Sequence, residues 1–193
     1  MIFRQLFDPQ SWTYTYLLAE RRGGEALIID PVLNGVPHYL RLIRELDLQL
    51  VMAVDTHIHA DHVTGVGRLR QATWCAAAMG EQARAECLSL RFREGETLWV
   101  DGIALKALYT PGHTDDSYSL VLPDRVFTGD TLLIGGTGRT DFQNGDPGAQ
   151  YDSLFGKLLT LPDKTVVYPA HDYEGRTSST IGMERQFNPR LQV

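Results

Sequence analysis

Three histidines and an aspartate crowd into one short string, T-H-I-H-A-D-H at residues 56–62, which follows the apolar run V-M-A-V at residues 51–54. A short apolar run of this kind is typical of a strand that is buried on both faces. Metal-ligating side chains that begin where such a strand ends lie at the edge of a sheet, where α/β folds place their chemistry. The string therefore indicates a fold built on sheets, with a functional site in the loops that follow the strands.

Other candidate ligands follow apolar runs in the same way. His113 follows the dipeptide Pro-Gly, Asp130 ends the run F-T-G-D, and His171 follows the dipeptide Pro-Ala. Imidazole and carboxylate groups together suit Zn, Fe or Mn, and not Ca, which prefers oxygen ligands. Only His38, in an expected helix, lacks such a setting, and we interpret it as an isolated residue. The repeated placement of donors after strands predicts a metal centre.

The first loop supplies enough donors for more than one metal position. His57 and His59 are two residues apart, so on an extended chain their side chains point the same way. The turn that follows redirects Asp61 and His62 toward a neighbouring point. The spacing is compatible with up to two metals and does not by itself choose between one and two.

The composition limits the kind of protein and its partners. With 193 residues, 43% of them apolar, we expect one domain over residues 1–193 with a substantial core. The formal net charge of −6 and the lack of Lys/Arg runs argue against nucleic acid and against a membrane surface as partners. The sequence shows no secretory signal pattern and no apolar stretch of membrane-spanning length, which predicts a cytoplasmic protein.

Hydrophobic periodicity outlines an α/β chain. A helix is expected over residues 36–47, where apolar residues recur at the i, i+3, i+4, i+7 spacing. Asp146 is the expected N-cap of a second helix whose core face includes Tyr151 and Phe155. The expected strands are 13–19, 26–29, 51–54, 97–100, 103–109, 117–122, 125–128 and 165–168, and a final helix is expected over 177–186. This order of elements predicts two sheets that face each other with helices outside.

Together, the metal-ligand motifs resemble the signature of the metallo-β-lactamase superfamily, in order and over nearly the whole chain. That resemblance implies an α/β fold, an αββα sandwich of two mixed sheets with helices on the outer faces. Within the superfamily the chain resembles the persulfide dioxygenases through segments outside the metal loops. These segments are R-Q-L-F-D at 4–8, I-D-P-V at 29–32, G-R-T-D-F-Q at 138–143 and N-P-R-L at 188–191.

The resemblance implies a cofactor and a reaction. One Fe(II) per chain would be held by His57, His113 and Asp130, the 2-His-1-carboxylate set of non-haem oxygenases. The terminal sulfur of glutathione persulfide would be oxidised by O₂ to give sulfite and glutathione. Catalysis would depend chiefly on bringing the persulfide and O₂ together at the metal. The three metal ligands are therefore the expected catalytic residues.

The remaining donors are expected to act around the iron and not on it. By the same resemblance, His59, Asp61, His62 and His171 match the second metal position of relatives that use two metals. In the persulfide dioxygenases these positions are expected to stay metal-free and to hydrogen-bond around the iron waters. Asp30 matches the first acidic motif of the superfamily and is expected to orient a ligand.

Substrate binding requires a cation near the metal. Glutathione carries two carboxylates, and the guanidinium of Arg offers two parallel donors to each of them. Arg139 is the first candidate, because it lies in the glycine-rich run G-G-T-G-R that the resemblance puts beside the site. Tyr173, two residues past the last histidine, is expected to donate its hydroxyl to the bound substrate. Arg176 is the third candidate.

Two alternatives stay open. A glyoxalase II-type hydrolase of glutathione thioesters shares the H-x-H-x-D-H string, but it uses two zinc ions and a metal-bound hydroxide. That family would imply a helical C-terminal domain with basic residues, which the residues up to Val193 do not contain. A non-catalytic metal-binding sensor on the same scaffold would be marked by loss of a ligand, and all the expected donors are present. A homodimer is compatible with the sequence.

Overall fold

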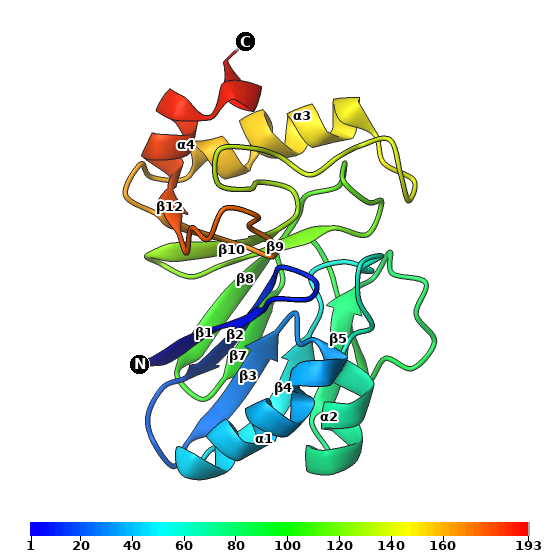
Figure 1. Cartoon of the computed structure of the whole chain (residues 1–193), viewed down its shortest axis with the longest axis vertical. Coiled ribbons are helices and arrows are strands. Elements are labelled where there is room, and N and C mark those ends of the chain that lie inside the picture. The colour runs from blue at the N-terminus through cyan, green and yellow to red at the C-terminus, as the bar shows by residue number, and fades with distance from the viewer. Residues whose placement is uncertain (193) are drawn as a thin grey trace.

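The computed structural model describes residues 1–192 and shows two stacked sheets with helices outside (Figure 1). The first sheet contains, in spatial order, β1 (Ile2–Asp8), β2 (Thr13–Ala19), β3 (Glu25–Ile29), β4 (Gln49–Val54), β5 (Ala76–Gly80) and β6 (Leu90–Phe92). The second contains β7 (Thr97–Val100), β8 (Ile103–Tyr109), β9 (Tyr118–Val121), β10 (Arg125–Gly129), β11 (Val166–Pro169) and β12 (Ser179–Thr180), in the order β12-β11-β10-β9-β8-β7. The helices are α1 (Val36–Glu45), α2 (Val66–Thr73), α3 (Pro147–Gly156) and α4 (Ile181–Phe187), with 3-10 turns at Leu33–Gly35, Leu158–Thr160 and Pro189–Leu191.

Both sheets are mixed. In the first sheet, β1, β2 and β3 pair antiparallel, whereas β3, β4, β5 and β6 run parallel. In the second sheet only β10 and β11 are parallel neighbours. Parallel neighbours end at the same edge of a sheet, so the loops that follow β10 and β11 begin side by side. These two loops and the loop after β4 carry most of the candidate ligands.

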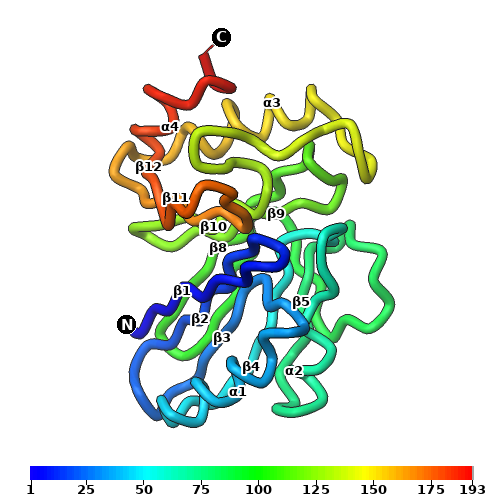
Figure 2. Tube along the Cα trace, in the orientation of Figure 1, coloured from blue at the N-terminus to red at the C-terminus, as the bar shows by residue number. Residues whose placement is uncertain are grey.

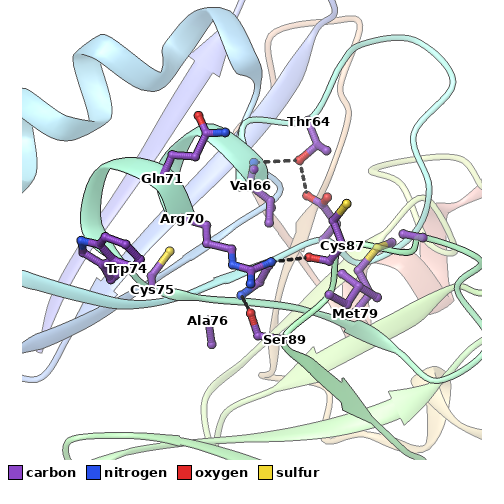
Figure 3. Close-up of a pocket in the computed structure, with 15 residues that line it drawn as sticks. Thr64, Val66, Arg70, Gln71, Trp74, Cys75, Ala76, Met79, Cys87 and Ser89 are labelled. Atoms are coloured by element: carbon purple, nitrogen blue, oxygen red, sulfur yellow. Dashed lines mark hydrogen bonds between the residues drawn. The ribbon is translucent and has the colours of Figure 1, made fainter.

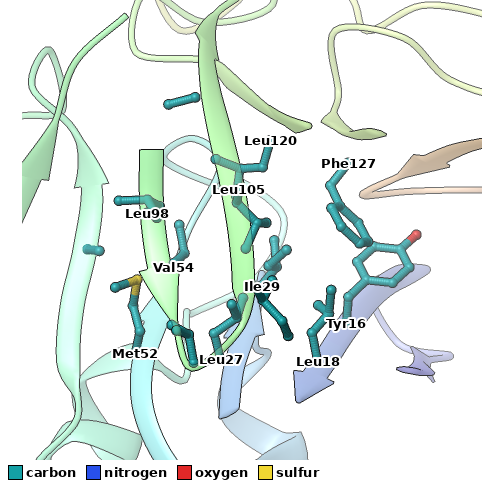
Figure 4. Close-up of a cluster of buried hydrophobic side chains, with 14 of the residues drawn as sticks. Tyr16, Leu18, Leu27, Ile29, Met52, Val54, Leu98, Leu105, Leu120 and Phe127 are labelled. Carbon is teal, nitrogen blue, oxygen red and sulfur yellow. The ribbon is translucent and has the colours of Figure 1, made fainter. Parts of the chain in front are cut away.

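The two sheets bury one apolar layer between them (Figure 4). Tyr16 and Leu18 of β2 point into this layer, while Leu17 and Ala19 of the same strand pack toward the helices. This alternation follows from the two-residue period of a strand, and it explains why β2 is buried on both faces. Leu105 of β8 lies in the same layer and is fully buried.

Each sheet is covered on its outer face by two helices. Tyr39 and Ile43 of α1 and Leu69 of α2 pack against the first sheet. Leu154 of α3 and Ile181 of α4 pack against the second. An apolar helix stripe and an apolar sheet face are both stabilised by burial against each other, which favours layered architectures of this kind. The predicted αββα sandwich is confirmed.

Several details differ from the sequence expectations. The first helix ends at Glu45, before residue 47, and the last helix begins at Ile181, because residues 179–180 pair with β11 as β12. Tyr151 was expected on the core face of α3 but is 51% exposed and stacks on Phe155, with ring centroids 4.4 Å apart. The strands β1, β5, β6 and β12 and the helix α2 were not predicted, because they are short or lack alternation and caps.

Within residues 1–192, no helix is both long enough and apolar enough to cross a membrane. The single domain over residues 1–193 stays a prediction. Its last residue, Val193, lies outside the described residues.

Candidate metal centre

Four segments that are far apart in the sequence meet where β4, β10 and β11 end and where β8 connects to β9. The turn between β1 and β2 lies next to the segment that follows β11 (Figure 2). There the amide of Tyr14 donates to the carbonyl of Ala170 at 2.7 Å, and Thr13 forms a bridge with His171. The structure thus brings together, in one site, the loops that contain the candidate metal ligands.

The structure brings His57, His113 and Asp130 together as one group of donors. Asp130 Oδ2 lies 3.5 Å from His113 Nε2 and 3.9 Å from His57 Nε2, and one donor atom of each residue lies within 4.8 Å of the others. The two imidazole rings are nearly perpendicular, with centroids 5.1 Å apart. His57 is 2% exposed and Asp130 is 8% exposed. His57 and Asp130 are therefore largely shielded from bulk water, and His113 is partly buried.

Hydrogen bonds on the far side of each ring set which nitrogen faces this point. His113 Nδ1 donates to the carbonyl of Arg139 at 2.8 Å, so the neutral ring leaves Nε2 without a proton. Thr56 Oγ1 donates its proton to Asp30 at 2.9 Å and is 3.0 Å from His57 Nδ1, so the hydroxyl oxygen is left to accept from that nitrogen. Burial, followed by the neighbouring His59, lowers the pKa of His57 well below its usual range. Both rings are thus prepared to offer a lone pair at Nε2.

A second group of donors consists of His59, Asp61, His62 and His171. Within residues 1–192, His59 Nδ1 and His62 Nε2 are buried without a hydrogen-bond partner. A buried imidazole nitrogen without a partner is unfavourable, so both atoms are available to water, substrate or a metal. This group adjoins the first, because the rings of His57 and His59 have centroids 4.1 Å apart.

His171 connects the two groups. Its Nδ1 lies 2.7 Å from Asp130 Oδ1 and its Nε2 lies 2.9 Å from Asp61 Oδ2. Burial by itself lowers the pKa of His171, but the two carboxylates outweigh burial and raise that pKa to about 10. The ring therefore carries a proton on each nitrogen, and it occupies Asp130 Oδ1 so that Oδ2 is left to face the first group.

Asp30 lies beneath the first loop, at the end of β3. Its Oδ1 accepts from the amide of Thr56 at 2.7 Å and lies 3.2 Å from His59 Nε2. Asp30 therefore orients His59 directly and reaches His57 only through Thr56. Its own backbone has φ 49°, a left-handed value that Asp tolerates better than most residues.

Two polar residues of the site were missed by sequence reasoning. Thr13 Oγ1 lies 3.1 Å from His171 Nε2 and 3.3 Å from His62 Nδ1, so it contacts the second group from the first position of β2. Asp116 accepts from the amide of Ile58 at 3.0 Å and so braces the first histidine loop. A Thr at the start of a strand carries no local signal for such a contact, and an Asp three residues after His113 carries none for a contact with the loop at residues 57–62.

The three substrate-binding candidates lie in different settings. Tyr173 is 60% exposed and its ring is parallel to that of His171, with centroids 6.1 Å apart. Arg139 is held by Asp141 at the surface, with hydrogen bonds of 2.7 and 3.0 Å, and its side chain is 66% exposed. Arg176 donates to the buried carboxylate of Asp172 at 2.8 and 3.0 Å. Of the three, only Tyr173 stacks on a member of the donor groups.

A groove of about 900 Å³ lies away from the first donor group, between α2 and the β5–β6 segment (Figure 3). Its wall is mostly apolar and includes Trp74, which is 91% exposed. Arg70 reaches across it and donates to the carbonyl of Cys87 at 2.8 Å. Asp55 lines the groove and accepts from Thr64 at 3.0 Å, and burial raises the pKa of Asp55 to about 7. Among the residues that line the groove, Asp55 lies beside His59 of the second donor group.

The fold and the donor spacing are those of a known superfamily. The family model described as the metallo-beta-lactamase superfamily matches residues 13–171. The chain belongs to this superfamily. TTHA1623 in a di-iron-bound form has a similar structure, with a TM-score of 0.81 at 27% identity, covering 99% of this chain and 100% of that one.

Closer relatives define the family within it. The mitochondrial persulfide dioxygenase ETHE1 of Mus musculus is 46% identical over 196 residues, which cover all of this chain and 77% of that protein. The crystal structure of ETHE1 from Myxococcus xanthus has a TM-score of 0.97 at 51% identity, covering 99% of this chain and 84% of that one. Within the superfamily, this chain therefore belongs to the persulfide dioxygenase family.

Proposed function

We propose that this chain is a mononuclear Fe(II) enzyme that oxidises the terminal sulfur of glutathione persulfide with O₂. The observation that carries the proposal is the compact His57, His113 and Asp130 set in a chain of the persulfide dioxygenase family. Glutathione persulfide, O₂ and one water give glutathione, sulfite and two protons. The sulfur atoms lose four electrons in total, and O₂ accepts them.

The donor set fits Fe(II). Two imidazoles and one carboxylate are the ligand set of non-haem iron oxygenases, and it leaves room for further ligands. His57 and His113 each direct Nε2 to the centre, and Asp130 directs Oδ2. When bound, the iron supplies a place where the persulfide sulfur and O₂ are held side by side.

We assign the second group to the surroundings of the metal. His171, protonated on both nitrogens, balances the charge of Asp130 and Asp61 and keeps Asp130 Oδ1 engaged. His59 Nδ1 and His62 Nε2 are left to hydrogen-bond with bound water or substrate. Removing a buried residue that hydrogen-bonds to a metal ligand typically lowers metal affinity or activity 10- to 100-fold.

The organic part of the substrate contacts the rim of the site in this proposal. Tyr173 donates its hydroxyl to the substrate from its position over His171. Arg139 exchanges Asp141 for a glutathione carboxylate, which is feasible because exposed ion pairs contribute little. Arg176 is the weaker anchor, since a substrate would have to compete with the buried carboxylate of Asp172.

One observation favours a second candidate, a binuclear zinc hydrolase of glutathione thioesters. His59, Asp61, His62 and His171 converge within 4.8 Å, and two of their nitrogens have no partner among residues 1–192. Four such donors are sufficient for a second metal, once His171 gives up the proton on its Nε2. The metal content of the protein separates the two candidates.

The deciding experiment combines metal analysis with an oxygen-electrode assay on glutathione persulfide. Protein from an iron-replete source should contain about one iron per chain and consume O₂ with formation of sulfite. His113→Ala should lose both bound iron and O₂ consumption, whereas His62→Ala should retain most of the iron and lose turnover. Two zinc ions per chain, or equal metal loss in both variants, would overturn the mononuclear proposal. The cytoplasmic location and a homodimer stay predictions.

A further inference from the structure

The carboxylate of Glu184 is buried beneath the glycine-rich loop that follows Asp130. Glu184 lies on α4 and is only 3% exposed. Its Oε2 accepts from the amide of Gly135 at 2.9 Å and from Asn188 Nδ2 at 2.7 Å. A carboxylate is seldom buried to this extent unless amide or cationic donors satisfy it. Both donors here are amides, and one belongs to the loop.

Asn188, the residue after α4, holds the same loop at the neighbouring glycine. Its Nδ2 donates to the carbonyl of Gly136 at 3.0 Å as well as to Glu184. Its Oδ1 accepts from the amide of Arg190 at 3.0 Å, which fixes the orientation of the side-chain amide. Asn188 is 1% exposed. The closing N-P-R-L motif therefore begins with a residue that faces the metal-site loop.

The far end of this loop lies directly on two candidate metal ligands. The amide of Gly138 donates to the carbonyl of Asp130 at 2.8 Å, and the carbonyl of Arg139 accepts from His113 Nδ1 at 2.8 Å. A Cβ at Gly138 would lie 2.1 Å from the Asp130 carbonyl oxygen and 2.9 Å from the His113 ring, so no side chain fits there. The position of the loop thus sets the position of the carbonyl that orients His113.

We propose that Glu184 and Asn188 are positioning residues for the metal centre. They hold the loop from Gly135 to Arg139 so that the Arg139 carbonyl keeps His113 in the Nδ1–H tautomer, with Nε2 free for the metal. The inference rests on the proposed metal site but not on persulfide oxidation. It also gives a physical reason for two motifs that lie outside the histidine loops. N-P-R-L supplies Asn188, which contacts the start of the loop, and G-R-T-D-F-Q supplies Gly138 and Arg139, which contact Asp130 and His113 at its far end.

The test uses Co(II) as the metal probe, with its visible absorption as the signal, on metal-free protein. Glu184→Ala should weaken Co(II) affinity roughly 10-fold or more. This is the effect expected when a residue that supports a metal ligand from outside the coordination shell is lost. Glu184→Gln keeps an oxygen acceptor for Gly135 and should stay within about threefold of the parent protein. Gln186→Ala, at an exposed position of the same helix, is the matched control and should change nothing.

A second readout separates positioning from simple loss of stability. In metal-free protein labelled with ¹⁵N histidine, the ring nitrogens of His113 should report the Nδ1–H tautomer in the parent and in Glu184→Gln. In Glu184→Ala, the His113 ring should populate both tautomers. This spectrum is recorded below the melting temperature of the variant, so that the protein is folded. If Glu184→Ala does not fold, Asn188→Ala, which removes the contact with Gly136, serves in its place.

Unchanged Co(II) affinity and an unchanged His113 tautomer in folded Glu184→Ala or Asn188→Ala would overturn the inference. Its failure is distinguishable from failure of the proposed function. If the parent protein binds Co(II) through His113 but does not consume O₂ with glutathione persulfide, the positioning role stands and the reaction is wrong.

Discussion

Arg139 pairs with Asp141 through two hydrogen bonds, yet both side chains remain largely exposed, at 66% and 70%. An exposed ion pair of this kind is screened by water and stabilises little. Asp141 therefore holds the guanidinium only weakly, and it competes with any carboxylate of the substrate. Arg139 can therefore exchange Asp141 for a substrate carboxylate, and substitution of either residue tests this exchange.

Removing each partner should change KM in opposite directions. Arg139→Ala should raise the KM for glutathione persulfide roughly 10-fold with little change in kcat, because a contact made equally in ground and transition states is lost. Asp141→Asn removes the competitor and should lower KM by about two- to threefold. Steady-state O₂ consumption at varied persulfide concentration measures both. Equal KM values in parent protein and both variants would show that Arg139 does not bind substrate.

Asp116 should make stability depend on pH. It is 3% exposed, and burial raises its pKa above the usual range, although hydrogen bonds from Thr114 and Ile58 oppose the shift. Because the folded pKa exceeds the unfolded value of about 4, the native state favours the protonated acid. The stability that protonated Asp116 contributes is therefore fully present below about pH 4, and it is lost as the pH rises through the pKa of Asp116 in the folded protein.

Asp116→Asn keeps an oxygen for the Ile58 amide and removes this titration. Relative to the parent protein, the variant should gain stability as pH rises from 4.5 to 7.5. Urea unfolding of the metal-free proteins across this range measures the difference between them. A difference that is constant with pH, or that shrinks as pH rises, would contradict the prediction.

At the scale of elements, α3 begins where the sequence predicted. Asp146 is its N-cap, and its side chain accepts from the amides of Gly148 at 2.7 Å and Ala149 at 2.9 Å. These amides would otherwise have no partner in the first turn. The cap also fixes the start of a helix that packs Leu154 onto the second sheet.

Loss of this cap should destabilise the protein modestly. Asp146→Ala should lower the free energy of unfolding by about 1 kcal/mol, the usual worth of an N-cap hydrogen bond. Asp152→Ala, at an exposed position of the same helix, is the control and should change it by less than about 0.5 kcal/mol. Urea unfolding monitored by circular dichroism measures both. Equal effects of the two substitutions would show that the cap is not what stabilises the start of α3.

At the scale of the whole molecule, the two sheets share one buried layer and should unfold together. Leu105 lies in this layer with no exposed surface. Leu105→Ala should lower the free energy of unfolding by about 2–5 kcal/mol, because it removes apolar contacts and leaves a cavity. Lys106→Ala, the next residue on β8 and exposed, should cost less than about 0.5 kcal/mol.

The same experiment tests how strongly the sheets are coupled. Tryptophan fluorescence and circular dichroism should report one common transition in the parent protein and in Leu105→Ala. Separate transitions would mean that the two sheets unfold as independent units.

Fold class and donor residues could be predicted because their signals are local. Strand and helix periods repeat over a few residues, and the string around His57 and His59 carries its spacing within one loop. The N-cap Asp146 was predicted for the same reason, since its partners lie two and three residues away. The unpredicted strand β5, an A-A-A-M-G run, lacks any such period and is a strand only because it pairs with β4 and β6.

The sequence by itself determined which side chains are available as donors, in what order they occur and that they follow strands. Only the tertiary structure decided how they are held: Thr13 contacts His171 across 158 residues of chain, and Glu184 contacts Gly135 across 49. It likewise decided that Tyr151 is exposed while Glu184 is buried. These outcomes depend on how two sheets and four helices pack against one another, and the free energy of that packing is a sum over many distant contacts that no local pattern of residues encodes.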